Sequence, residues 1–156
     1  MIEENGSIIN ISSYAGSRGV LGLAGYGASN AALESYTRVA ALELADRHIR
    51  VNCISPGTIH TGLNDKEHGR TEMRAATILQ PLIHVGHPGE VAALAHFLAS
   101  SNCSLITGQA IALDGGKSAG ISRAVQHLVV SAASQRGRAP MASRVSPPGA
   151  RPGIVP

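Results

Sequence analysis

Short apolar runs alternate with longer helical patterns along the first two thirds of the chain. The runs at 7–13 (SIINISS), 49–55 (IRVNCIS) and 109–113 (QAIAL) are nearly continuously apolar and include β-branched residues. Such runs are typical of strands that are buried on both faces of a parallel sheet. Turn residues close the second and third runs, as Pro56-Gly57 and Asp114-Gly115-Gly116. We therefore predict three strands at these positions.

Two longer stretches have helical character. Residues 25–48 are dominated by Ala, Leu and Glu and contain no proline, and Pro88 is suited to the first position of a second helix. In the first stretch one apolar stripe contains Leu33, Tyr36, Ala40 and Leu44, and a further set lies off that stripe, namely Ala28, Ala32, Val39 and Leu42. A helix that is apolar on two sides must bury both, so we expect it to pack on its own sheet and on a second surface.

The order of these elements, β–α–β–α–β, predicts an α/β fold with a parallel sheet. Ligands of such sheets bind at the carboxyl ends of the strands. Ser12 and Ser13 end the first predicted strand, Tyr26 begins the helix, and Pro56-Gly57 ends the second strand. The topology therefore predicts two hydroxyls, a phenol and a Pro-Gly turn at one edge of the sheet.

The composition excludes several classes of protein. Hydrophobic residues make up 44% and charged residues 15% of the 156 residues, which predicts a packed core. Aromatic residues make up only 3%, which argues against a platform that stacks nucleic-acid bases. No apolar run approaches a membrane span of about 18 residues, so no membrane partner is expected. Cys53 and Cys103 form no CxxC pair, so we expect a reducing, cytoplasmic location.

The net charge of +3 belongs to the carboxyl-terminal part of the chain. Residues 118–156 hold five arginines and no acidic residue, whereas residues 1–117 hold eight basic and ten acidic groups. We divide the chain into a domain at 1–120 and a basic tail at 121–156. The tail is expected to form a short helix at 121–132 and to be disordered over 133–156, where large apolar residues are few. Its charges are sparse, so we expect no nucleic-acid partner, and an anion-binding tail remains a separate alternative.

Three stretches together resemble the short-chain dehydrogenase/reductase family. These are GSIINISS, YGASNAALESYTRVAALELADRHIRVNCISPGTIHT and ITGQAIALDGG, and thirteen positions separate Ser13 from Tyr26. The resemblance covers residues 6–117 and corresponds to the carboxyl-terminal half of a Rossmann-type doubly wound parallel sheet. Within the family, this stretch is similar to the 3-oxoacyl-carrier-protein reductases and to the sugar and steroid dehydrogenases.

The resemblance implies hydride transfer between NAD or NADP and a small carbonyl or alcohol substrate. Tyr26 matches the acid/base of the family, and Ser13 matches the residue that hydrogen-bonds the substrate oxygen. The turn that holds the nicotinamide carboxamide matches Pro56, Gly57, Ile59 and Thr61. The family also implies a homo-oligomer formed through helix 25–48 and the last strand. Residues 58–80 are expected to shape the substrate pocket, although they do not identify the substrate.

Two departures from the family pattern bear on activity. The family has Tyr-x-x-x-Lys, and here Asn30 stands at the lysine position, where it provides a dipole but no charge. Tyr14 and Arg18 repeat the spacing with a cation, but they lie in the Gly-rich stretch. The Gly-rich dinucleotide turn of the family precedes the matched region, and the chain has no G-x-G-x-x-G. We therefore expect a fragment that is inactive or weakly active alone, with Met1 internal to a longer protein. The alternative is a non-catalytic oligomerisation or interaction module.

The histidines do not form a recognisable metal motif. His60, His68, His84 and His87 lie close together in the sequence, but no cysteine or acidic residue completes a set at metal-ligand spacing. We expect ordinary loop histidines and no metal.

Overall fold

The computed structural model describes residues 5–61, 78–82 and 84–138, and residues 135–138 only in their backbone. Three parallel strands form its centre, in the order β1-β2-β3. The strands are β1 (Ser7–Ile11), β2 (Arg50–Pro56) and β3 (Ala110–Leu113). The α-helices are α1 (Ala24–Glu43), α4 (Pro88–Ala99) and α5 (Arg123–Arg138), and the short 3-10 turns are η1 (Tyr14–Gly16), η2 (Ala45–Arg47) and η3 (Ser101–Cys103).

The predicted strands and the alternating α/β order are confirmed. Within the described residues β2 is the central strand, with Ile54 beside Ile11 of β1 and beside Ile111 of β3. The predicted helix at 25–48 ends earlier than expected, because α1 stops at Glu43 and η2 follows. His48 then turns the chain into β2 with a φ of 54°, in the left-handed region.

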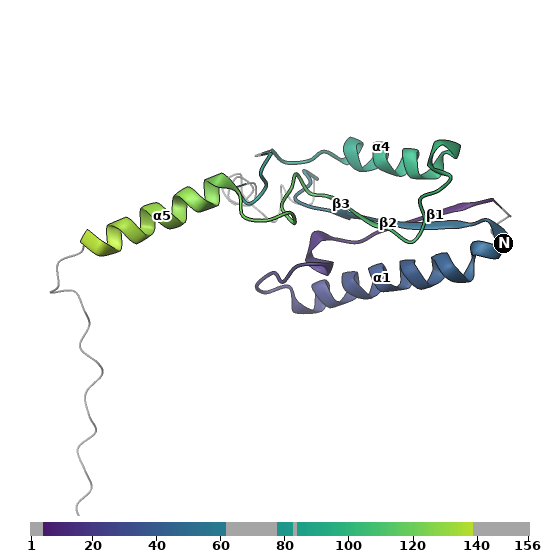
Figure 1. The fold of residues 1–156 in the computed structure, drawn as a ribbon, viewed down its shortest axis with the longest axis horizontal. Coiled ribbons are helices and arrows are strands. Elements are labelled where there is room, and N and C mark those ends of the chain that lie inside the picture. Colours follow the sequence, from purple (N-terminus) through teal and green to yellow (C-terminus); the bar gives the residue numbers. More distant parts are fainter. Residues whose placement is uncertain (1–4, 62–77, 83, 139–156) are drawn as a thin grey trace, which may run out of the picture.

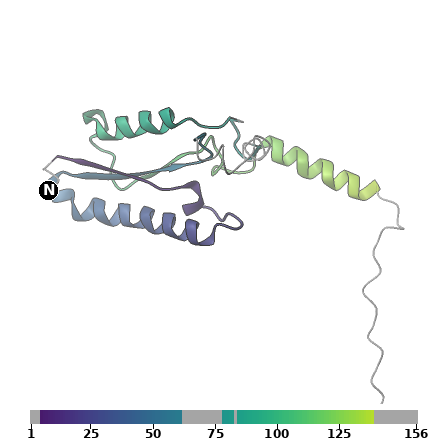
Figure 2. The same cartoon turned by 180° about the vertical axis from the view of Figure 1, so that it is seen from behind.

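The two helices α1 and α4 cover opposite faces of the sheet, as Figures 1 and 2 show from front and back. On the α1 face a core forms from Ala40, Ala41, Ile49 and Val51, with Ile8 and Leu44 beside it. On the α4 face Ile54, Leu98 and Cys103 form a second core. Because successive residues of a strand point to opposite faces, Ile8 and Ile9 of β1 contribute to different cores.

The buried face of α1 differs from the apolar stripe predicted from the sequence. Its buried residues include Asn30, Glu34 and Thr37, whereas Tyr36 of the predicted stripe is 59% exposed. The reason is that β1 presents polar side chains to this helix. The Asn10 amide donates to Thr37 Oγ1 at 2.9 Å, and Ser12 bonds Glu34. The helix therefore packs through paired polar groups as well as through alanines.

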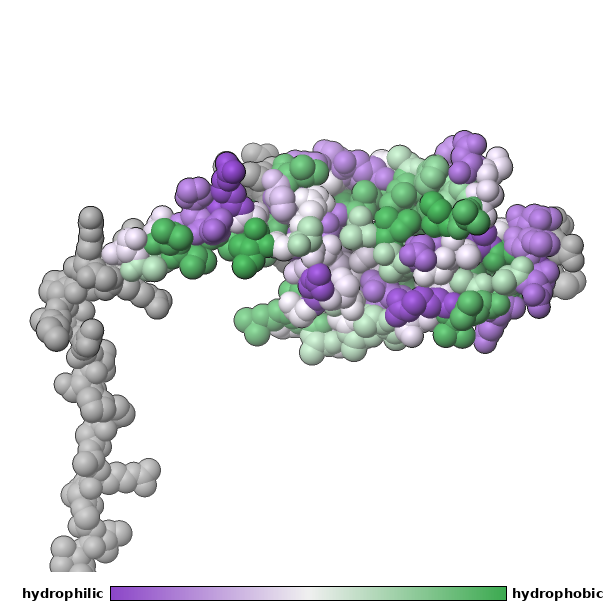
Figure 3. Space-filling model, in the orientation of Figure 1, coloured by the Kyte–Doolittle hydropathy of each residue, from purple (hydrophilic) through white to green (hydrophobic). Residues whose placement is uncertain are grey.

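Helix α5 extends away from the sheet on the side where the strands have their carboxyl ends (Figure 1). It runs to Arg138, six residues beyond the predicted helix end at 132. Leu128, Val129 and Val130 are exposed along it, and apolar side chains are visible there in Figure 3. Residues 139–156 lie outside the described residues. In the described part of the chain, no helix combines the length and apolarity that crossing a membrane requires.

Candidate active site at the carboxyl ends of the strands

Ser13 lies just after β1 and starts the turn η1. Its backbone is extended, and its Oγ accepts a hydrogen bond from the Ala15 N–H at 3.2 Å. This contact uses a lone pair of the hydroxyl, and the hydroxyl hydrogen has no acceptor among the described residues. Ser13 is therefore held in place by its neighbour while its O–H remains able to donate.

Tyr26 lies in the first turn of α1, close to η1. A Cβ on Gly27 would lie 2.9 Å from the carbonyl oxygen of Ala15, so the helix and the turn touch at this glycine. Ser13 lies two residues before Ala15, and Tyr26 directly precedes Gly27. The Tyr26 side chain is 53% exposed, and its phenol has no hydrogen-bond partner within the described ranges. The structure thus brings the backbone segments that carry Ser13 and Tyr26 together.

Asn30 lies one helical turn after Tyr26 and is buried. Its Nδ2 donates to the backbone carbonyl of Tyr26 at 2.7 Å, a bond back to the preceding turn. A Cβ on Gly16 would be 2.9 Å from the carbonyl carbon of Asn30, so η1 packs directly on this part of α1. Asn30 therefore fastens the helix beneath Tyr26 and brings no charge to the site.

A buried polar pair, Ser12 and Glu34, was not singled out as a functional pair from the sequence. Ser12 Oγ donates to Glu34 Oε1 at 2.9 Å, and both residues are almost fully buried. Glu34 lies one turn after Asn30, so the pair ties β1 to α1 directly behind the site. In the sequence, Glu34 stands out only because it lies four residues after Asn30 and eight after Tyr26. That spacing does not identify Ser12 as its partner.

The turn after β2 is held in place by backbone bonds and by one buried glutamine. Gly57 N donates to Leu113 O at 3.0 Å, and Thr58 N donates to Gln80 Oε1 at 2.7 Å. Gln80 is 2% exposed and also donates from Nε2 to His84 O. Sequence reasoning missed Gln80, because it lies 22 residues after Thr58 and carries no motif.

The remaining predicted turn residues are placed at the same edge. Ile59 forms a parallel bridge with Gly86, and Pro56 is the last residue of β2. Thr61 is the last described residue before 62–77. Residues 62–77 make up most of the expected substrate loop at 58–80 and lie outside the described residues. A Cβ on Gly57 would approach Asp114 Cα to 2.7 Å, so this position requires glycine. The turn therefore packs closely on the end of β3.

The loop histidines contact one another and one acidic residue. The rings of His60 and His87 are tilted, with centroids 6.2 Å apart, and His84 Nε2 lies 3.7 Å from Glu90 Oε1. Among the described residues no group of three or more His, Cys, Asp or Glu side chains could hold a metal ion.

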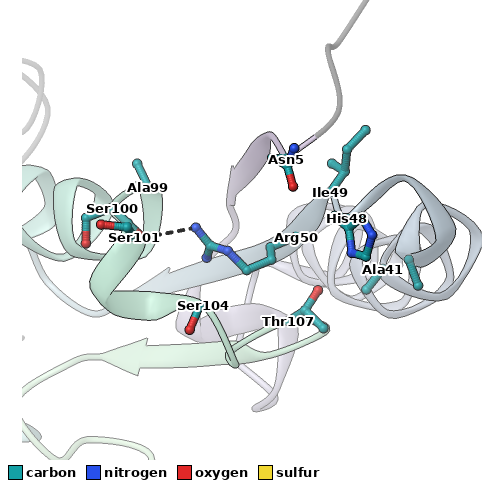
Figure 4. Close-up of a pocket in the computed structure, with 11 residues that line it drawn as sticks. Asn5, Ala41, His48, Ile49, Arg50, Ala99, Ser100, Ser101, Ser104 and Thr107 are labelled. Carbon is teal, nitrogen blue, oxygen red and sulfur yellow. Dashed lines mark hydrogen bonds between the residues drawn. The ribbon is translucent and has the colours of Figure 1, made fainter.

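A separate hollow of about 570 Å³ lies at the opposite, amino-terminal edge of the sheet (Figure 4). Arg50 lies in it and donates to the carbonyls of Leu98 and Ser100, at 2.6 and 3.2 Å. These bonds cap the carboxyl end of α4, where carbonyls lack helical partners. Arg50 therefore has a structural role here, and the hollow is remote from the predicted hydroxyls.

A parallel sheet with helices on both faces (Figure 1) is an open Rossmann-type α/β fold, and ligands of such folds bind at the carboxyl ends of the strands. The chain belongs to the short-chain dehydrogenase/reductase family. The family model described as enoyl-(acyl carrier protein) reductase matches residues 1–118. This result confirms the resemblance found in the sequence.

Similar proteins have been described in bacteria. An uncharacterised oxidoreductase of Bacillus subtilis is 42% identical over 123 residues, a match that covers 74% of this chain and 45% of the relative. The 3-oxoacyl-acyl-carrier-protein reductase of Thermotoga maritima is 43% identical over 114 residues, covering 73% of this chain and 46% of the relative. The chain thus spans about half the length of the curated relatives it matches.

Solved structures resemble the chain to a similar extent. ElxO with NADP bound superposes with a TM-score of 0.68 at 33% identity, over 73% of this chain and 47% of ElxO. A blue fluorescent protein from a metagenomic library, in complex with NADPH, superposes with a TM-score of 0.69 at 34% identity. That match covers 74% of this chain and 46% of the fluorescent protein.

Proposed function

We propose that this chain forms the substrate-side half of an oxidoreductase that transfers hydride between NAD(P)(H) and a small carbonyl or alcohol. The observation that carries the proposal is the pair of Ser13 and Tyr26. Ser13 follows the end of β1 and Tyr26 lies in the first turn of α1, and neither hydroxyl hydrogen has an acceptor in the described part of the chain. Acid catalysis needs such a protonated donor within reach of the substrate oxygen.

Each hydroxyl has a defined task in the proposed reduction. The Tyr26 phenol donates its proton to the carbonyl oxygen of the substrate, and the Ser13 hydroxyl donates a hydrogen bond to the same oxygen. In the oxidative direction the phenolate takes the proton of the alcohol. The nicotinamide, when bound, supplies or accepts the hydride.

The residues present fit the nicotinamide end of such a cofactor. The turn at Pro56, Gly57, Ile59 and Thr61 lies at the same edge, and Gln80 fixes its backbone through Thr58. The close approach of Gly57 to Asp114 leaves this turn little freedom. We propose that these four residues hold the carboxamide, and that the diphosphate and adenosine are bound by parts of a longer protein. We favour NADP, since two of the similar structures contain NADP or NADPH.

A test of catalysis uses the protein isolated from its own cells, whose intact mass is measured first. A mass well above 16.0 kDa would mean that further segments accompany this chain. NADPH oxidation is then followed with a panel of aldehydes and ketones. Tyr26→Phe should lower the rate at least about a hundredfold, the usual contribution of a general acid. Tyr36→Phe is the matched control, because Tyr36 is similarly exposed on the outer side of α1. Equal rates for the two variants would refute the proposal.

The second candidate is a non-catalytic oligomerisation or interaction module. It is favoured by a set of exposed apolar residues on α1, namely Tyr36, Val39 and Leu42, of which Leu42 is 79% exposed. We propose that α1 and β3 form the contact with a second copy of the chain. Sedimentation should then show an oligomer that Leu42→Glu dissociates and that His96→Glu, an exposed position of α4 on the other face of the sheet, leaves intact. The module needs no cofactor, so oligomerisation without any NADPH binding would favour it over the enzyme. A cytoplasmic location is proposed for either candidate.

A further inference from the structure

A small cavity lies between the η1 turn, the segment after β3 and the start of α5. Its volume is about 220 Å³. Tyr14, which follows Ser13 directly, forms part of its wall. The other lining residues are Arg18, Leu79, Lys117, Gly120, Ile121, Ser122 and Val125. The cavity therefore reaches the residue that follows Ser13.

Two cations line this cavity without a carboxylate partner. The Lys117 ammonium lies over the Tyr14 ring, 4.1 Å from its centroid. Arg18 donates from Nη2 to the carbonyl of Ser118 at 2.8 Å. Neither cation forms an ion pair with any residue of the chain that the structure describes. The two cations thus contact a π face and backbone carbonyls, and no carboxylate within the described ranges forms an ion pair with them.

The nearby acidic residue is already engaged. The Asp114 carboxylate accepts the backbone N–H of Gly116 at 3.0 Å and that of Ser118 at 2.8 Å. Burial lowers the pKa of Lys117, and the charge of Asp114 opposes this shift. A partly buried ammonium has lost part of its hydration, and an anion in the cavity would replace it.

The opposite wall of the cavity is apolar and lies outside the family match. Ile121 and Val125 belong to the segment that starts α5, whereas the family model ends at residue 118. The Ser122 hydroxyl accepts the N–H of Val125 and donates to Ile78 O, which fastens the helix start to the body. The cavity therefore combines residues of the matched family region with residues that follow it.

We propose that this cavity binds the anionic group of a small amphipathic ligand, a carboxylate or phosphate carried on a short apolar stem. Arg18 and Lys117 hold the charge, and Ile121, Val125 and Leu79 contact the stem. A cavity of about 220 Å³ has room for such a short stem beside the two cations. This identification rests on the proposed function: the ligand is the substrate, and its reacting carbon would lie towards Ser13.

Calorimetric titration of the chain, at fixed ionic strength and without cofactor, tests the binding itself. The probes are hexanoate, hexyl phosphate and the neutral hexanamide. An anionic probe should bind at least about tenfold more tightly than hexanamide, and the tighter of the two anions identifies the head group. Equal affinity for all three probes, or binding of none, would overturn the proposal.

Variants locate the binding. Lys117→Gln and Arg18→Gln should each weaken the anionic probe about tenfold, whereas Lys117→Arg keeps the charge and should retain binding. Arg38→Gln is the matched control, since it removes an exposed cation of α1 that does not line the cavity. A loss in Arg38→Gln equal to that in Arg18→Gln would show non-specific attraction and refute the site. Because these titrations omit the cofactor, their outcome is independent of the Tyr26→Phe experiment.

Discussion

Gly57→Ala tests how tightly the turn after β2 packs on the end of β3. The added Cβ would lie 2.7 Å from Asp114 Cα, 2.8 Å from Asp114 Cβ and 2.9 Å from Gln80 Oε1. Two of these neighbours cannot simply rotate away. Asp114 Cα is backbone that follows β3, and Gln80 Oε1 accepts the Thr58 N–H. The methyl group must therefore displace the turn.

The expected loss of stability follows from three contributions. Overpacking costs about 1–3 kcal/mol, and weakening the bond from Gly57 N to Leu113 O costs about 1 kcal/mol more. Replacing glycine also reduces the entropy of the unfolded chain, which returns about 0.4–1 kcal/mol. We expect a net destabilisation of about 2 kcal/mol.

Urea unfolding followed by far-ultraviolet circular dichroism measures this loss. With a slope of about 2 kcal/mol/M, the midpoint should fall by about 1 M. Gly89→Ala is the control, because a Cβ on Gly89 in α4 would meet nothing within 4 Å. That variant should be as stable as the original or slightly more stable, since alanine favours helix. An unchanged midpoint for Gly57→Ala would mean that the turn yields to a methyl group, and the packing argument would be wrong.

Three further predictions concern α1 and α4. Ser12→Ala and Glu34→Gln should be coupled by about 1–3 kcal/mol in a double-mutant cycle of urea unfolding, because their side chains share a buried hydrogen bond, and additive losses would contradict this. In a catalytically complete form of the protein, Asn30→Lys should raise the NADPH oxidation rate at least about tenfold. A lysine charge about 5 Å from the Tyr26 oxygen would stabilise its phenolate by about 3 kcal/mol, and solvent screening of the half-exposed phenol reduces this energy. An unchanged rate would exclude that role for the charge. The backbone N–H of His87 holds the pKa of Glu90 below its ordinary value of 4.5, so the carboxylate stabilises α4 above that pH and this contribution is lost as the pH falls below it. Acid unfolding profiles should show this loss, and a Glu90→Gln variant with the same acid dependence as the original chain would count against it.

The location of each strand was predictable from short-range patterns. The predicted run at 49–55 and the observed β2 differ by one residue at each end, because a buried central strand must be apolar along its length. The run at 7–13 was predicted two residues too long. Ser12 and Ser13 leave the strand because their hydroxyls bond Glu34 and the η1 backbone.

The buried face of α1 was not predictable in the same way. Hydropathy favoured Tyr36 for the core, but the helix buries Glu34 and Thr37 instead. Most buried polar residues have a hydrogen-bond partner, and the partners of Thr37 and Glu34 are Asn10 in β1 and Ser12 just after it, more than twenty positions away in the sequence. Hydrogen-bonded pairs therefore determine which face of α1 is buried. A hydropathy pattern assigns a value to each residue separately and contains no information about such pairs.

The sequence by itself determined the order of strands and helices, the family, and the edge at which Ser13, Tyr26 and Gly57 lie. Periodicity and turn residues suffice for these, because the carboxyl ends of parallel strands share one edge. Only the tertiary structure decided that Asn30 bonds the Tyr26 carbonyl, that Gln80 holds Thr58, and that Lys117 lies over Tyr14. Two of these three contacts join residues distant in the chain, and all three depend on geometry of a few tenths of an ångström. Close packing sets such geometry, and local pattern does not.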